Sequence, residues 1–212
     1  WLNNAGAGRV FAADSGVSAL AKLEVESIDL IVTDVRMPRM DGIKLVRSIR
    51  EKGRFFPSTI FMSGFSDIDR RDLYALGVEA FFAKPINAQE LVKAVENALA
   101  VRSELWRVPM SVTPKQSVLI EVRSLELSGD HHQVHIGRGG FSVRYNDAPR
   151  LGEIAFRCHS PGEGRELAGQ GGVRWISKND RRMGIEFSYL EEPSRSWVLG
   201  EIETSRTASF IP

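Results

Sequence analysis

The segment LIVTDVRMPRMDG, residues 30–42, constrains the fold more than any other part of the chain. An apolar run, Leu30-Ile31-Val32, leads into Asp34, and the turn-forming residues Pro38 and Gly42 follow. Continuous apolar runs of this kind are typical of strands in parallel sheets, which are buried on both faces. Open α/β sheets carry their chemistry at the carboxyl ends of such strands. The pattern therefore predicts that Asp34 is a functional carboxylate at that edge of a sheet.

Two further apolar runs end on a polar residue. Ser63 follows Ile60-Phe61-Met62, and Lys84 follows Phe81-Phe82-Ala83. Alone, each would be read as a turn or surface residue, but the three in this order resemble the phosphoacceptor site of bacterial response-regulator receiver domains. The resemblance implies that Asp34 is phosphorylated, that the Ser63 hydroxyl senses the phosphoryl group and that Lys84 screens its charge. It also implies that Phe81 changes its packing when the Ser63 hydroxyl moves. By the same resemblance, the Lys84-Pro85 bond is expected to be cis, an isomer that X-Pro bonds tolerate.

Strands and helices are predicted to alternate through the first half of the chain. The expected strands are residues 9–13, 28–33, 59–62 and 80–83, and the expected helices are residues 16–26, 43–52, 67–76 and 88–100, the last capped by Asn87. Such alternation predicts a parallel sheet covered by helices on both faces. The resemblance implies a receiver domain over residues 1–104, with a flavodoxin-like, doubly wound fold.

One part of the receiver pattern is not found. In that family the central first strand ends in an acidic pair that holds Mg²⁺ together with the phosphoacceptor, whereas this sequence starts at Trp1-Leu2, in what resembles the end of the first helix. Asp34 and, by resemblance, the backbone carbonyl of Arg36 remain as ligands, and Mg²⁺ prefers more oxygens than these. We therefore expect either about 30 further N-terminal residues, the usual length of a strand and helix unit, or a truncated chain.

The second half of the chain has the pattern of an all-β domain. Strands are expected at residues 117–123, 134–136, 141–145, 153–159, 173–176 and 183–189, with glycine-rich turns at 137–140, 162–164 and 169–172 and a helix at 193–203. Short, regularly spaced strands of this kind predict a small barrel. Residues 105–109 (LWRVP), 136–143 (IGRGGFSV) and 183–187 (MGIEF) resemble PilZ domains, which are six-stranded barrels. The resemblance assigns residues 105–212 to a divergent PilZ-like domain.

Many PilZ domains bind cyclic di-GMP through two arginines, three residues apart, and a downstream Asp/Asn-x-Ser-x-x-Gly turn. Arg107 stands in the second arginine position, and Arg102 lies one residue away from the first. Only Gly140 of the turn is retained, with Arg138 beside it. By resemblance these four residues are the candidate ligand site for cyclic di-GMP, and the departures predict weak or absent binding. The glycines around Arg138 are read either as a backbone nest for an anion or, more simply, as a tight turn.

Composition limits the partners and the compartment. Residues 1–104 contain 14 Lys and Arg and 14 Asp and Glu, and residues 105–212 contain 14 and 13. This balance lacks the basic excess of a dedicated DNA-binding domain, so no DNA partner is expected. No apolar run approaches the roughly 20 residues of a membrane span. The single cysteine, Cys158, fits a reducing cytoplasm.

Together these features predict a cytoplasmic two-component response regulator, not an enzyme. A sensor histidine kinase would phosphorylate the receiver, with Mg²⁺ as cofactor, and the receiver would control the PilZ-like domain, a protein partner or self-association. Two alternatives stay open: a cyclic di-GMP effector that the receiver modulates, and a scaffold that works without phosphorylation.

Overall fold

The computed structural model describes residues 8–52, 57–64, 69–101, 104–111, 113–122, 125, 134–146, 149–204 and 209–212. The chain forms two compact units, Trp1–Ala100 and Val101–Pro212. Each unit has its own hydrophobic core.

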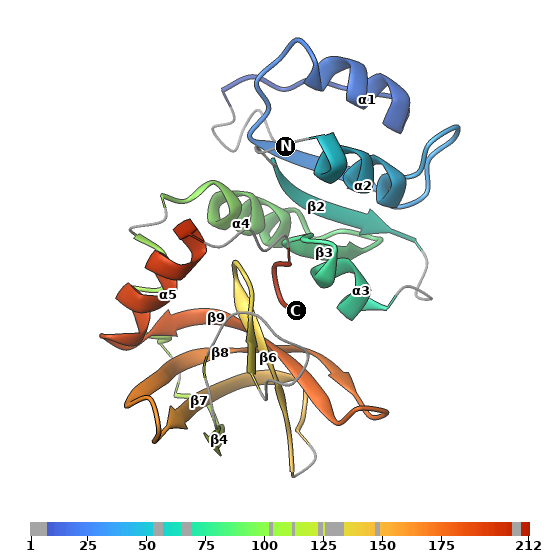
Figure 1. The fold of residues 1–212 in the computed structure, drawn as a ribbon. Helices are drawn as coiled ribbons and strands as arrows, with labels where there is room; N and C mark the ends of the chain where they lie inside the picture. The colour runs from blue at the N-terminus through green and yellow to red at the C-terminus, as the bar shows by residue number, and fades with distance from the viewer. Residues whose placement is uncertain are drawn as a thin grey trace. The chain divides into compact units, whose positions relative to one another are not determined.

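The first unit is built on a parallel sheet with the strand order β1-β2-β3. The strands are β1 (Leu30–Asp34), β2 (Ser58–Ser63) and β3 (Ala80–Ala83), and the helices are α1 (Gly16–Leu23), α2 (Gly42–Lys52), α3 (Arg70–Ala75) and α4 (Ala88–Leu99). Figure 1 shows the strands running side by side among these helices. The predicted alternation of helix and strand is confirmed.

Both faces of this sheet are covered, as successive residues of the central strand show. Ile60 packs with Leu91 and Val95 of α4 on one face. Its neighbour Phe61 packs with Val46 of α2 and Leu73 of α3 on the other. Because side chains alternate across a strand, a run that is apolar at every position serves two cores at once.

The helices begin where capping side chains are available. Asn87 accepts a hydrogen bond from the backbone N–H of Gln89 at 2.9 Å, which confirms the predicted cap of α4. Ser15 and Ser18 form a reciprocal capping box at the start of α1. Asp69 caps α3 by accepting from the N–H of Arg71.

The strand predicted at residues 9–13 is wrong, because this segment has no strand pairing. A strand needs a neighbour for its backbone hydrogen bonds. Within the described residues β1 pairs only with β2, so no strand connects residues 9–13 to the sheet.

The second unit is a single six-stranded sheet with the order β4-β7-β8-β9-β6-β5. Its strands are β4 (Gln116–Glu121), β5 (Val134–Ile136), β6 (Gly140–Arg144), β7 (Gly152–Ser160), β8 (Arg165–Ser177) and β9 (Arg182–Leu190), and α5 (Ser194–Thr204) follows. The sheet curls around one apolar core, as Figure 1 shows, and β4 runs parallel to β7 while the other pairs are antiparallel. Six strands were predicted, and the described residues of this unit form six, in a half-barrel whose outermost strands are β4 and β5.

The glycine-rich turn predicted at residues 169–172 is also wrong, because these residues lie inside β8. A side chain at Gly169 would overlap the carbonyl oxygen of Tyr189, and one at Gly171 would overlap that of Glu186. A register shift falls between Gln170 and Gly171. The glycines therefore permit close approach of β9 at an irregular point of the sheet.

Candidate functional site

Asp34, Ser63 and Lys84 come together at the carboxyl edge of the first sheet. Asp34 ends β1 opposite Met62, and Ser63 ends β2 opposite Ala83, the residue before Lys84. The Lys84 ammonium Nζ lies 2.8 Å from Asp34 Oδ1 and donates to Oδ2 at 2.9 Å. Both side chains are partly exposed, at 38% for Asp34 and 45% for Lys84, so the pair is open to a reactant. The parallel register of the strands thus brings Asp34 and Lys84, which are fifty positions apart in the sequence, into contact.

The loop after Asp34 is held against the end of β1. The N–H of Val35 donates to the carbonyl of Met62 at 2.9 Å, and the N–H of Gly42 donates to the carbonyl of Val35 at 2.8 Å. A side chain at Gly42 would overlap the carbonyl oxygen of Asp34. Gly42 therefore allows α2 to start close to the backbone of Asp34.

Ser63 lies at the end of β2, and Phe81 lies within β3. Ser63 is 4% exposed, and its carbonyl accepts from the N–H of Lys84 at 2.8 Å. Phe81 stands opposite Phe61 in the register and packs, half-buried, against the core shared with α2 and α3. The Lys84-Pro85 bond is cis, as expected.

Sequence reasoning missed a second contact to the loop, from Asp14. Its carboxylate accepts from Ser18 at 2.7 Å and from Ser15 at 3.0 Å, and it pairs with Arg39 at 3.2 Å. The Ser18 and Ser15 hydroxyls, with the charge of Arg39, lower the pKa of Asp14 below its usual range. Arg39 has a left-handed φ of 65°. The serine pair before an apolar helix was the available signal, because it marks a capping box.

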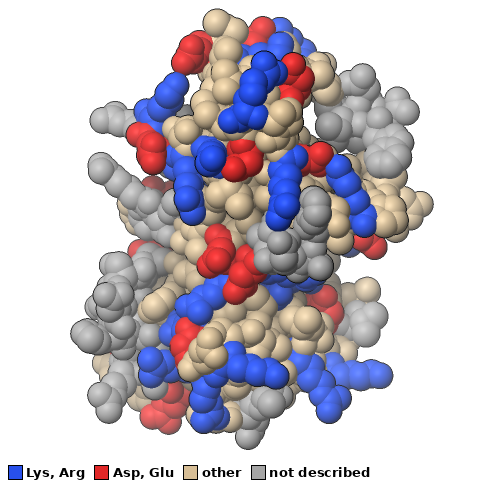
Figure 2. All heavy atoms as spheres, turned by 90° about the vertical axis from the view of Figure 1, so that its right-hand side faces the viewer, with Lys and Arg blue, Asp and Glu red and all other residues tan. Residues whose placement is uncertain are grey.

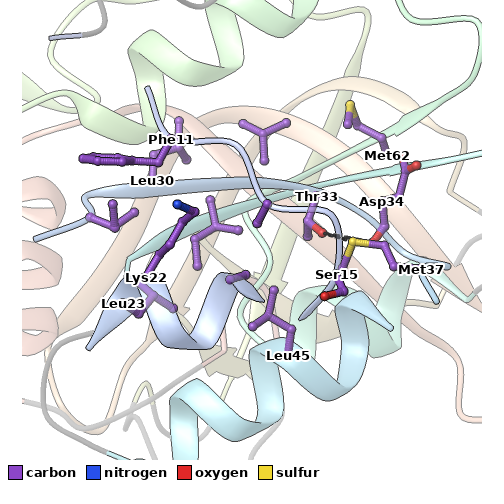
Figure 3. Close-up of a pocket in the computed structure, with 15 residues that line it drawn as sticks. Phe11, Ser15, Lys22, Leu23, Leu30, Thr33, Asp34, Met37, Leu45 and Met62 are labelled. Carbon is purple, nitrogen blue, oxygen red and sulfur yellow. Dashed lines mark hydrogen bonds between the residues drawn. The ribbon is translucent and has the colours of Figure 1, made fainter. Parts of the chain in front are cut away.

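A cavity of about 300 Å³ runs along the outer edge of β1. All five residues of β1 line it, although they point alternately to the two faces of the sheet, so the cavity follows the strand edge. Phe11 and Ala13 line it from the segment that was expected to be a strand. In Figure 3, Phe11 lies at one end and Asp34 with Met37 at the other.

Receiver domains in general use Mg²⁺ for phosphorylation, and the described residues do not make a site for it on their own. Asp34 is paired with Lys84, Asp14 with Arg39 and Asp41 with Lys44. No group of three metal-ligating side chains occurs in the described part of the chain. Because Mg²⁺ takes near-octahedral oxygen coordination, Asp34 with loop carbonyls such as that of Arg36 is too small a ligand set.

The candidate ligand residues of the second unit that the structure describes contact other residues of that unit. Arg107 donates to both carboxylate oxygens of Glu104, at 2.8 and 3.0 Å, in an exposed pair. Arg102 lies outside the described residues. Gly140 begins β6, and the N–H of Gly137 donates to its carbonyl at 2.8 Å, so this segment is a tight turn.

The alternative of an anion nest at this turn is not upheld. A nest needs alternating right- and left-handed backbone, and no residue of Gly137–Gly140 has a left-handed φ. The N–H groups of Arg138 and Gly139 instead donate to the carbonyls of Ser209 and Phe210. Gly137 and Gly139 leave space for residues 209–212, because a Cβ at either position would overlap them.

The first unit thus has the site of an aspartate-based α/β switch: a partly exposed carboxylate, a lysine and a serine on adjacent strand ends. Residues 1–96 match the model of the response regulator receiver domain family. This part of the chain is a receiver domain.

Several curated proteins and solved structures are similar to parts of this chain. The regulatory protein VanRc of Enterococcus gallinarum is 39% identical over 84 residues, which is 40% of this chain and 36% of that protein. The transcriptional regulatory protein CpxR of Klebsiella pneumoniae is 29% identical over 157 residues, 71% of this chain and 66% of that protein. A receiver domain protein from Clostridium thermocellum is 31% identical, with a TM-score of 0.41 over 46% of this chain and 79% of that one. The chain spans about a third to two thirds of the curated relatives' length.

The prediction that DNA is not a partner needs correction. It conflicts with the relatives, because CpxR is named as a transcriptional regulatory protein. The prediction rested on the balance of charge in each half, and a net count says nothing about where charges gather. Figure 2 shows Lys and Arg side chains interspersed with Asp and Glu over the face in view. Separately, no helix among the described residues is long and apolar enough to cross a membrane.

Proposed function

We propose that the chain is a two-component response regulator in which Asp34 accepts a phosphoryl group from a sensor histidine kinase. The observation that carries the proposal is the Asp34–Lys84 pair at the carboxyl edge of the sheet, with Ser63 on the next strand end. In this reaction a carboxylate oxygen of Asp34 attacks the phosphorus of the donor. The bond from phosphorus to the donor's leaving atom breaks, and the leaving group departs with its electron pair.

The neighbouring residues support an aspartyl phosphate at this position. Phosphoryl transfer depends mainly on positioning and on neutralising charge. Lys84 already lies within hydrogen-bond distance of the carboxylate and would screen the added negative charge. Ser63 would respond through its hydroxyl and Phe81 through its half-buried ring, which lies in the core shared with α2 and α3.

We also propose that the second unit is a PilZ-like output module and that the chain as a whole is a regulator without catalytic activity of its own. The six strands in one curled sheet, followed by α5, support the first part. Relatives are named as transcriptional regulatory proteins, which supports transcription as the process that the module serves. A nucleotide-independent output is favoured, because Arg107 and the glycine turn contact other parts of the same unit.

The test is phosphorylation of the full chain by acetyl phosphate in a buffer that contains MgCl₂. Attack by Asp34 releases acetate and leaves an acyl phosphate, a mass increase that peptide mass spectrometry assigns to a residue. Wild-type protein should be modified within residues 30–39, and Asp34→Asn should not. Asp41→Asn is the matched control, because Asp41 lies in the same loop and pairs with Lys44. Equal modification of wild type and Asp34→Asn, or modification of wild type at a residue other than Asp34, would refute the proposal.

A further inference from the structure

The segment Ser209–Pro212 lies against the turn between β5 and β6. The N–H of Arg138 donates to the carbonyl of Ser209 at 3.0 Å, and the N–H of Gly139 donates to that of Phe210 at 2.9 Å. Two successive donors thus meet two successive acceptors some seventy residues further along the chain. In Figure 1 this segment is the short red trace that ends at the label C.

The glycines of the turn fit this segment closely. A Cβ at Gly139 would overlap the ring of Phe210, and a Cβ at Gly137 would lie 2.6 Å from the carbonyl oxygen of Phe210 and 2.8 Å from Pro212 Cδ. Neither glycine has a left-handed φ, so backbone conformation does not require glycine at either position. The Arg138 guanidinium lies 5.9 Å from the centre of the Phe210 ring, a cation–π distance. The turn is therefore shaped for an extended segment that carries an aromatic side chain.

We propose that the turn Gly137–Gly140 is a peptide-binding surface that the chain closes with its own segment Ser209–Pro212. Release of the segment opens the surface to an extended peptide with a small residue followed by an aromatic one. Ile211 of the segment is fully buried, beside the two backbone hydrogen bonds and the Phe210 ring. A free peptide of four residues loses its translational and rotational freedom to make the same contacts, so it binds weakly. A segment joined to α5 through four residues has an effective concentration in the millimolar range and excludes a weak competitor. The chain thus holds its own surface closed.

The test uses the full chain, the chain without residues 209–212, and an acetylated Ser-Phe-Ile-Pro peptide. The readout is two-dimensional NMR of the backbone amides, because the proposal specifies which amides respond. Deletion should shift the Arg138 and Gly139 amides and speed their hydrogen exchange. The peptide should then restore both in the shortened chain and bind it at least about tenfold more tightly than the full chain. The same peptide with alanine for phenylalanine should bind neither protein.

Two substitutions in the full chain keep the proposal testable if the deletion disturbs folding. Phe210→Ala removes the ring but keeps both acceptor carbonyls, so the free peptide should displace the weakened segment. Gly139→Ala should eject the segment and also block the peptide. Gly162→Ala is its control, since a Cβ there meets nothing within 4 Å. Equal peptide affinity for all variants, or no binding to either the shortened chain or Phe210→Ala, would overturn the proposal.

Discussion

At the scale of single residues, the Asp34–Lys84 contact is expected to matter for phosphorylation and little for the stability of the fold. Both side chains are more than a third exposed, and ion pairs of that kind change stability little. The same lysine is the cation beside the carboxylate, where an added phosphoryl group would place negative charge. Its contribution should therefore be visible in phosphorylation and nearly invisible in unfolding.

We predict that Lys84→Met lowers the initial rate of Asp34 phosphorylation by about tenfold or more, because the incoming charge loses its screening cation. The free energy of unfolding should change by no more than about 1 kcal/mol. Acetyl phosphate labelling and urea titration measure the two quantities. Lys93→Met, an exposed lysine on α4, serves as the control. A large loss of stability with normal labelling would show that Lys84 is structural.

Cys158 gives a second prediction at this scale. The thiol is fully buried, and loss of solvation raises its pKa to about 12, against 9.0 for a free thiol. The folded state therefore keeps its proton at pH values where the unfolded chain releases one. Unfolding releases a proton between about pH 9 and 12, so this group stabilises the second unit fully below pH 9 and progressively less as pH rises.

The measurement has two parts. Iodoacetamide at pH 8 should leave Cys158 unmodified in native protein and label it in urea. Between pH 8 and pH 10 the urea midpoint of the second unit should fall further for wild type than for Cys158→Ala, which lacks the titrating group. Rapid labelling of the native protein would contradict the burial.

The residues of this site differ in how far sequence could predict them. Asp34, Ser63 and Lys84 were predictable because each ends an apolar run, and parallel register necessarily brings such ends together. The contact of Asp14 with Arg39 was not, because it depends on a left-handed residue within a loop. The spacing of apolar residues predicts helices and strands, but it does not predict the conformation of a loop.

At the scale of elements, sequence predicted strand content better than strand ends. Residues 80–83 were placed correctly, whereas the predicted strand 173–176 is the end of a strand that starts at Arg165. Glycine usually marks a turn, and in β8 it instead marks close backbone approach by β9. Whether a glycine forms a turn or permits close approach of a strand depends on which segment packs against it in the fold.

The outer edge of β1 leads to a prediction about residues 1–104 expressed alone. Within the described residues this edge has no strand partner, and an apolar cavity runs along it. Unpaired strand edges recruit further strands, because their N–H and C=O groups remain unsatisfied. The fragment should therefore self-associate, with an oligomer fraction that grows with protein concentration in light scattering. A monomer that melts cooperatively at all concentrations would show that the edge is covered in another way.

At the scale of the whole molecule, the question is which signal the second unit receives: a phosphoryl group on the receiver, or a nucleotide bound to itself. The groups available for cyclic di-GMP are few. Arg107 is paired with Glu104, and the backbone donors of the glycine turn are used by Ser209 and Phe210. A nucleotide would have to break both sets of contacts. The Glu104 pair is exposed and weak, so the turn is the larger obstacle.

We therefore predict that the full chain binds cyclic di-GMP with a dissociation constant well above the micromolar range. A single arginine fork contributes about 2–3 kcal/mol, and each missing 1.4 kcal/mol costs tenfold in affinity. Arg107→Ala should then change the measured affinity little, and so should the exposed control Arg150→Ala. Sub-micromolar binding that depends on Arg107 would contradict this and favour the nucleotide effector. If the chain does not bind cyclic di-GMP but Asp34 is phosphorylated, the signal to the second unit comes from the receiver. With both absent, the scaffold that works without phosphorylation is the remaining alternative.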